Sequence, residues 1–391
     1  MRGIIFLLIV FTSLTKLNAQ ELNFFQGNII DKNTSLPIPY CSIKLLNSNK
    51  TVISNTEGVF VFNKKIDNGD TILITSIGFM PLKIKVKDIN IRGSRVFMLE
   101  QDITLLDEVK IKPLVVTQVL AEAIKRSSEK YASPIILNGF YKEYVKRDSL
   151  LAKYADGIIS YYIKKNKDWS PKIALQINES RVKEIVLVDE EDKMNELGTP
   201  ISIKNLALFA TPTASPVMDS SNFKNYKFSM LETENNKKAA YIISFIPVVG
   251  SEKALYAGKI YIDKTTLLII GLDYTVAPIS EPYLKEVNLL GYRISSTSRL
   301  VSARYKIDDD NYYLVYVGKS FGMQINSKRY NQTNEFKSEF WLIEAQTKDC
   351  VPFKNGYTKN ALYKRGTNYN TEFWNKYDFV GNTEEELKFL K

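Results

Sequence analysis

The sequence predicts a mainly β protein, in which an antiparallel β-sandwich is followed by an α+β domain with an antiparallel sheet. Short apolar runs alternate with turn signals from residue 24 to about residue 111. One segment with helical periodicity follows, and long alternating runs rich in Tyr and Phe continue to about residue 345. Since 391 residues exceed one common hydrophobic core, we expect two domains.

The N-terminus has the pattern of a secretory signal peptide. Arg2 precedes the uninterrupted apolar run Ile4–Phe11, and the small residue Ala19 stands before Gln20. We therefore expect residues 1–19 to be removed and the remaining chain to be exported. No later apolar stretch approaches eighteen residues, which predicts a protein that is soluble or peripherally attached to a membrane.

Composition excludes several classes of function. The chain has no histidine, which excludes Ser-His-Asp and Cys-His catalysis and every zinc site that contains histidine. The 53 basic and 43 acidic residues are interspersed, so nucleic-acid binding is not expected. Cys41 and Cys350 lie far apart in sequence, and the sequence leaves open whether they form a disulfide.

The first domain consists of short strands separated by polar turns. "SNTEGVFVF" (54–62) is a turn followed by a strand, in which Phe60 and Phe62 are expected on one face and Val59 and Val61 on the other. Gly58 gives the backbone the freedom to enter this strand. Similar runs, "IPYCSIKLL", "TILITSIGF" and "SRVFMLEQ", complete the sandwich pattern.

This domain resembles the carboxypeptidase-like regulatory domain over residues 24–111. The resemblance is carried by Gly27, Asp31, Pro37, Pro39, Tyr40, Ile43, Leu45, Thr56, Gly58, Phe60, Asp70, Ile72, Ser76, Gly78, Phe79 and the closing "LDEV" of Leu106–Val109. It implies a transthyretin-like sandwich that acts as a non-catalytic accessory module. Such modules are found at the N-termini of many Bacteroidota envelope proteins, including TonB-dependent receptors.

The second domain is expected over residues 115–345. Val116, Val119, Leu120, Ala123, Ile124 and Ser127 share one helical face, which predicts a helix that covers the next sheet; a helix on a membrane surface is the alternative. The strands that follow pair as hairpins about "TENNKK", "DKTT" and "DDDN". The segment "YAGKIYIDKTTLLIIGLDY" resembles a hairpin of lipoprotein-carrier-like half-barrels, which implies a curved sheet around an apolar groove. The polar tail, 346–391, ends in "NTEEELKFLK", a candidate docking helix.

No residue is assigned to catalysis, to a cofactor or to a metal. The acidic runs 189–192 and 308–310 are interpreted as solvated loops, Asp263 as a turn residue, and the S-x-x-K match at Ser127–Lys130 as part of a helix end. Aromatic side chains are interpreted mainly as core, with carbohydrate stacking as the alternative; those considered are Tyr161, Tyr162, Tyr312, Tyr313, Trp169 and Trp341.

The sequence therefore favours a non-enzymatic, exported envelope protein, periplasmic or associated with the outer membrane, whose second domain binds an apolar or extended ligand or a partner protein. The partner is expected to be an envelope protein, a lipid or a glycan, and peripheral membrane association is possible. The alternatives are a purely structural or interaction protein, a small outer-membrane β-barrel with an accessory domain, and a carboxylate-based glycan enzyme. The ligand and the oligomeric state are left open.

Overall fold

The structure is a computed structural model of the chain. It describes residues 25–48, 50–62, 66–89, 95–101, 113–166, 171–184, 202–232, 240–289, 291–308, 311–328, 331–367, 372, 374 and 382–390. The expected signal peptide, the Leu106–Val109 motif, the acidic run 189–192, Trp169, Asp309 and Asp310 lie outside these residues, as does the whole "TENNKK" turn.

The first domain is the predicted β-sandwich. Its described strands form two sheets, in the orders β4-β1-β7 and β3-β2-β5-β6. Their bounds are β1 (Phe25–Asp31), β2 (Ser42–Leu45), β3 (Lys50–Ile53), β4 (Val59–Phe62), β5 (Thr71–Thr75), β6 (Leu82–Lys85) and β7 (Val96–Leu99). The pairs are antiparallel except β1 with β7, which is parallel. Alternation of apolar residues carries no information on strand direction, so this parallel pair was not predicted.

The turn before β4 shows why its residues are Asn and Gly. Asn55 Oδ1 accepts hydrogen bonds from the N–H groups of Glu57 and Val59, both at 2.9 Å, which closes the turn. Gly58 has a φ of +73°, and a Cβ there would lie 2.3 Å from the carbonyl oxygen of Ile29. The strand then alternates as predicted, with Phe60 fully buried.

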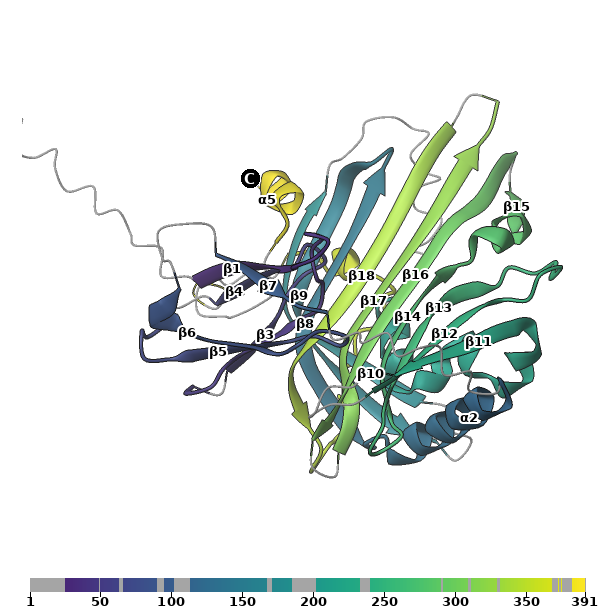
Figure 1. Cartoon of the computed structure of the whole chain (residues 1–391). Helices are drawn as coiled ribbons and strands as arrows, with labels where there is room; N and C mark the ends of the chain where they lie inside the picture. Colours follow the sequence, from purple (N-terminus) through teal and green to yellow (C-terminus); the bar gives the residue numbers. More distant parts are fainter. Residues whose placement is uncertain are drawn as a thin grey trace, which may run out of the picture.

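The second domain is built on one large, curved antiparallel sheet (Figure 1). Its order in the described chain is β10-β9-β8-β18-β17-β16-β14-β13-β12-β11, with β15 paired to β16. The bounds are β8 (Ile135–Arg147), β9 (Leu150–Lys165), β10 (Pro171–Glu184), β11 (Tyr226–Glu232), β12 (Ala240–Pro247), β13 (Tyr256–Asp263), β14 (Ile269–Val276), β15 (Glu286–Leu289), β16 (Tyr292–Asp308), β17 (Asn311–Asn326) and β18 (Asn331–Gln346). The long aromatic alternations thus became neighbouring strands, and the predicted curved sheet is confirmed.

Part of the concave face is covered by helix α2 (Pro113–Lys130) and by the segment 202–225 (Figure 1). The apolar side of α2 faces the sheet as predicted, with Leu120 and Ala123 fully buried. The second segment consists of short helical turns with buried apolar residues, including Phe209. The short helices of the chain are η1 (Val86–Asp88), α3 (Ile203–Leu206), η3 (Ala207–Ala210), η4 (Pro212–Ala214), η5 (Pro216–Met218), η6 (Ser220–Asn225), η7 (Pro278–Tyr283), η8 (Leu362–Arg365) and α5 (Glu384–Leu390).

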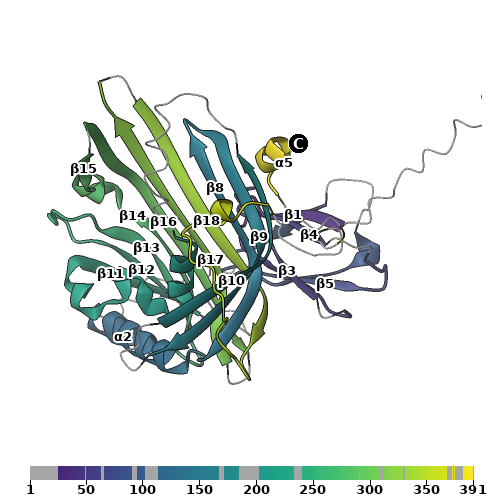
Figure 2. The same ribbon diagram turned by 180° about the vertical axis from the view of Figure 1, so that it is seen from behind.

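The described parts of the C-terminal segment lie on both faces of the sheet, close to the edge strand β10. Leu362 lies in the core of the concave side, and the carbonyl oxygen of Gly366 accepts a hydrogen bond from Ser180 Oγ of β10 at 2.9 Å. Trp374 and helix α5 lie on the convex face, where Lys142 forms an ion pair with Glu386. The described parts of the last forty residues therefore contact both faces of the sheet, and the predicted docking helix is present (Figure 2).

The sandwich packs on the convex face of the sheet, opposite α2 (Figures 1 and 2). The ring of Tyr40 stacks on Tyr316 of β17 with 4.0 Å between centroids. The guanidinium of Arg304, which is paired with Asp273 of β14, also lies over the Tyr40 ring. These contacts place an aromatic and charged layer between the two domains.

Two further observations concern attachment and cross-linking. Among the described residues, no helix combines the length and the apolar character that crossing a membrane requires. Cys41 and Cys350 are both free thiols, the first in the sandwich core and the second in the C-terminal segment. The disulfide that the sequence left open is therefore not formed in this structure.

Candidate functional site: the concave face of the large sheet

The register of the central strands aligns side chains in rows across the concave face. One row crosses β8, β18, β17 and β16 through Glu143, Ser338, Lys319 and Val301. The neighbouring row consists of Val145, Phe336, Phe321 and Arg299. Because side chains alternate between faces, these residues point to the same side as the core residues Tyr141 and Phe340.

Glu143 is the buried acid of the first row. Its Oε2 accepts a hydrogen bond from the Tyr141 hydroxyl at 2.6 Å, and its Oε1 accepts one from the N–H of Tyr363 at 2.8 Å. Burial raises the pKa of Glu143 to about 7, and these hydrogen bonds oppose the rise. Glu143 therefore anchors the C-terminal segment to the sheet, since both of its oxygens are used within the chain.

Arg299 and Lys319 form a cation pair on the same face. They are diagonal neighbours on β16 and β17, because Arg299 is paired with Phe321 and Lys319 lies two residues before Phe321. The Arg299 guanidinium lies over the Phe321 ring, 5.3 Å from its centroid, and the Lys319 ammonium is 5.9 Å from the Phe209 centroid. Burial lowers the pKa of Lys319, and the positive charge of Arg299 lowers it further.

Neither cation is neutralised by the described chain. Within the ranges that the structure describes, the side chains of Arg299 and Lys319 have no hydrogen-bond or ion-pair partner. The Arg299 Nε is also buried without an acceptor. Elsewhere the sheet pairs its buried cations, as Lys142 is paired with Glu386 and Arg181 with Asp156. The cation pair therefore differs from the structural charges of this fold.

An apolar cluster lies next to the cation pair, and we call it the apolar end. It consists of Val145, Phe336, Phe321 and Met323, which belong to three adjacent strands of the concave face. This cluster is separate from the main core that α2 and the segment 202–225 cover. The concave face thus combines two cations with an apolar cluster in which Phe321 and Met323 are half-buried, an arrangement that suits a ligand with both characters.

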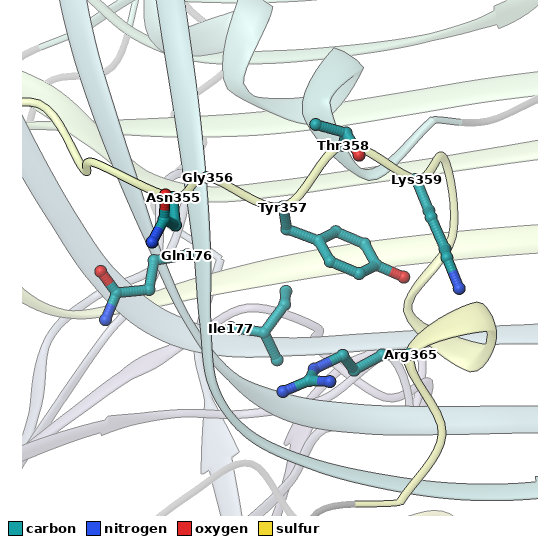
Figure 3. Close-up of a pocket in the computed structure, with 8 residues that line it drawn as sticks. All are labelled: Gln176, Ile177, Asn355, Gly356, Tyr357, Thr358, Lys359 and Arg365. Atoms are coloured by element: carbon teal, nitrogen blue, oxygen red, sulfur yellow. The ribbon is translucent and has the colours of Figure 1, made fainter.

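A second candidate is a pocket of about 330 Å³ between β10 and the C-terminal segment. Figure 3 shows Gln176 and Asn355 at one end of it, with Lys359 and Arg365 toward the other. Lys359 Nζ already donates a hydrogen bond to the carbonyl oxygen of Lys364 at 2.9 Å. The pocket lies at the sheet edge and most of its lining is exposed, so it is a weaker candidate than the concave face.

Of the aromatic residues considered for carbohydrate stacking, the five that the structure describes are core residues. Tyr161 and Tyr312 are fully buried, and their hydroxyls donate to the carbonyl oxygens of Ile203 and Ile269 at 2.6 Å. Tyr162, Tyr313 and Trp341 are likewise buried. Their interpretation as core holds, and none presents a ring to solvent.

The polar candidates also have structural roles. Asp263 Oδ1 accepts hydrogen bonds from the N–H groups of Thr265 and Thr266, as expected of a turn residue. Ser127 Oγ accepts one from the N–H of Ile269 at 2.9 Å, which ties α2 to the sheet.

Sequence reasoning missed Arg299 and Lys319, because single cations in polar alternations look the same whether they face solvent or the concave side. The one feature of the sequence that could have indicated them is that each lies two residues from an apolar residue of the same strand face, Val301 for Arg299 and Val317 for Lys319.

Comparisons with known proteins agree with this architecture. Residues 25–111 match the family model described as the CarboxypepD_reg-like domain, which confirms the resemblance of the first domain. A search of curated protein sequences gives no match.

Three solved structures are similar over about 60% of the chain each. A DUF1329 family protein from Desulfovibrio piger is 10% identical, covers 60% of this chain and 94% of its own, and gives a TM-score of 0.24. A LolA superfamily protein from Nitrosomonas europaea is 7% identical, covers 59% and 97%, and gives 0.18. Lipovitellin, in a structure described by its lipid–protein interactions, is 8% identical, covers 58% and 27%, and gives 0.28. Scores this low carry no functional argument. The chain therefore joins a carboxypeptidase-regulatory-like domain to a large curved antiparallel sheet, and a LolA superfamily protein is among the structures similar to it.

Proposed function

We propose that this protein is an extracytoplasmic, non-catalytic binding protein of the carrier type, whose second domain holds an apolar or extended ligand on the concave face. The sandwich acts as an accessory or docking module on the opposite face. The expected signal peptide and the regulatory-like domain support export to an envelope compartment. The proposed division is a sandwich over 24–111, a binding domain over 115–345 and a C-terminal tail over 346–391.

The observation that carries this proposal is the apolar end beside two unpaired cations. A structural sheet face is normally closed by apolar packing and by paired charges. Here α2, the segment 202–225 and Leu362 contribute to one continuous core, whereas Val145, Phe336, Phe321 and Met323 form a separate cluster. Burial of a ligand against such a surface contributes about 25 cal/mol per Å² of apolar area before ordering costs.

The experiment is to purify the protein under mild conditions, extract it with organic solvent and identify bound small molecules by mass spectrometry. We expect apolar ligand in near-stoichiometric amount from the wild type and much less from Phe321→Asp. The matched control is Leu300→Asp, because Leu300 is exposed and points to the convex face of β16, next to Arg299. A wild-type extract without ligand, together with no binding of an added fluorescent apolar probe, contradicts the proposal.

A purely structural or interaction role is the rival, and one observation favours it. Exposed apolar side chains occur on β12, β15 and β16 and in the segments beside them; they are Ile246, Val248, Val249, Ile279, Tyr283, Val287, Leu289 and Leu300. Exposed apolar side chains of this size can contribute to contacts with other molecules. If the second domain has a purely structural or interaction role, the extract contains no ligand and Phe321→Asp lowers only the stability of the protein.

A further inference from the structure

We propose that the ligand of the concave face is an acidic amphiphile of the long-chain fatty acid type, whose carboxylate is bound by Arg299 and Lys319 while its chain lies along the apolar end. This inference rests on the proposed function and names its ligand class. It depends on three features: the cations, their missing partners and the surface beside them.

The first feature is the position of the two charges. Arg299 and Lys319 occupy adjacent rows of neighbouring strands, on the same face. Each side chain is held over an aromatic ring, Phe321 or Phe209, which orients it and removes part of its water. Two cations held side by side on a rigid sheet form a preorganised anion site, because little side-chain entropy is left to lose on binding.

The second feature is the lack of compensation. Glu143 is the acid in the same row, two strands from Lys319, and its oxygens accept hydrogen bonds from Tyr141 and Tyr363. In the described chain no other acid pairs with either cation, and the Arg299 Nε is buried without an acceptor. Like charges in a partly desolvated site repel, and a bound anion relieves that repulsion. A guanidinium also suits a carboxylate, which it can bind with two parallel hydrogen bonds.

The third feature is the apolar end itself. Phe321 is shared by both parts of the site, since Arg299 covers its ring and its neighbours in the cluster are Val145, Phe336 and Met323. Val145 and Phe336 are buried in the cluster, whereas Phe321 and Met323 are half-buried, so a ligand with an anionic head at Arg299 can continue onto these two side chains. A small anion such as phosphate leaves that surface unused, and an uncharged lipid leaves the two cations unpaired.

The test compares ligands that differ only in the head group. Palmitic acid, cetyl alcohol and methyl palmitate compete at pH 8 for a fluorescent apolar probe bound to the full-length protein. We expect wild-type protein to bind palmitate at least about tenfold more tightly than the alcohol or the ester, as a charge-assisted contact predicts. In Arg299→Met with Lys319→Met, palmitate affinity should fall to that of the alcohol, while the alcohol affinity stays within about twofold.

Two further variants separate charge from folding. Arg293→Met is the matched control, because Arg293 is exposed on the other face of β16 and should leave the palmitate preference unchanged. Lys319→Arg keeps the charge and should keep the preference. Equal wild-type affinity for palmitate and cetyl alcohol, or a double variant that still prefers palmitate, overturns this inference alone. Absence of binding for all three ligands contradicts the proposed function instead.

Discussion

Neutralising Glu386 should release the C-terminal helix from the sheet. The side chains of Lys142 and Glu386 are only 2% and 3% exposed, and Nζ lies 2.9 Å from Oε1 and 3.1 Å from Oε2. Burial disfavours the charged Lys142, yet its pKa is raised above the ordinary value because Glu386 and Glu339 stabilise the ammonium. The substitution Glu386→Gln removes this charge while keeping the side-chain shape.

The expected magnitude follows from the burial of the pair. Removing one partner of a buried ion pair costs about 3–5 kcal/mol. Because Glu339 and Asp156 also act on Lys142, we expect the lower value, about 3 kcal/mol, for Glu386→Gln. If α5 opens by itself, that value corresponds to about a hundredfold loss of hydrogen-exchange protection in residues 382–390, with little change in β8 or β9.

Hydrogen exchange measured by mass spectrometry tests this prediction, and two variants serve as comparisons. Thr383→Ala removes the helix cap, since Thr383 Oγ1 accepts from the N–H of Glu386 at 3.2 Å, and should cost about 1 kcal/mol. Lys142→Met combined with Glu386→Gln removes both charges of the pair, keeps an acceptor for the N–H of Thr383, and should restore most of the protection. The reasoning is refuted when Glu386→Gln exchanges no faster than Thr383→Ala, or when the double variant is the least protected.

Three further predictions concern other parts of the chain. Folding raises the pKa of Glu143 from 4.5 to about 7, so the folded chain holds the carboxyl proton more tightly than the unfolded chain does. The free energy of unfolding should therefore fall by about 3 kcal/mol as pH rises from 4.5 through 7. Denaturant unfolding of Glu143→Gln should show a flatter pH profile, and an unchanged profile contradicts this. Iodoacetamide should label Cys350 in the native protein and Cys41 only after unfolding, because Cys41 is fully buried and burial raises its pKa to about 12. Intact-mass spectra that show Cys41 labelled in the native protein contradict this prediction. Tyr40→Ala should remove the stack on Tyr316 at the domain contact and increase the radius of gyration in small-angle scattering, whereas an unchanged radius shows that other contacts suffice.

The fold was predicted to the extent that it depends on periodicity. Helix α2 begins and ends close to the predicted segment, and its predicted face is the one that packs on the sheet. The hairpin at Asp263 followed from local turn chemistry, which needs only the residues beside it. The pattern "NTEEEL" contained the capping box of α5, in which Thr383 and Glu386 bond each other's backbone N–H groups.

The candidate site could not be predicted in the same way. Whether Arg299 faces solvent or the concave side depends on the register of β16 against β17, and this register includes two irregular shifts between the strands. Each such shift changes the face on which the residues after it lie. The pairing of Lys142 with Glu386 joins residues 244 positions apart, which no local pattern encodes.

By itself, the sequence determined the mainly β class, the regulatory-like first domain, the covering helix α2 and the absence of histidine chemistry. These properties depend on composition and on neighbours within a few residues. The tertiary structure alone decided that the C-terminal segment contacts both faces of the sheet, that the sandwich stacks on the convex side and that two cations meet beside an apolar cluster. Those arrangements depend on strand order and register, because contacts between distant segments are fixed only when the whole sheet closes around its core.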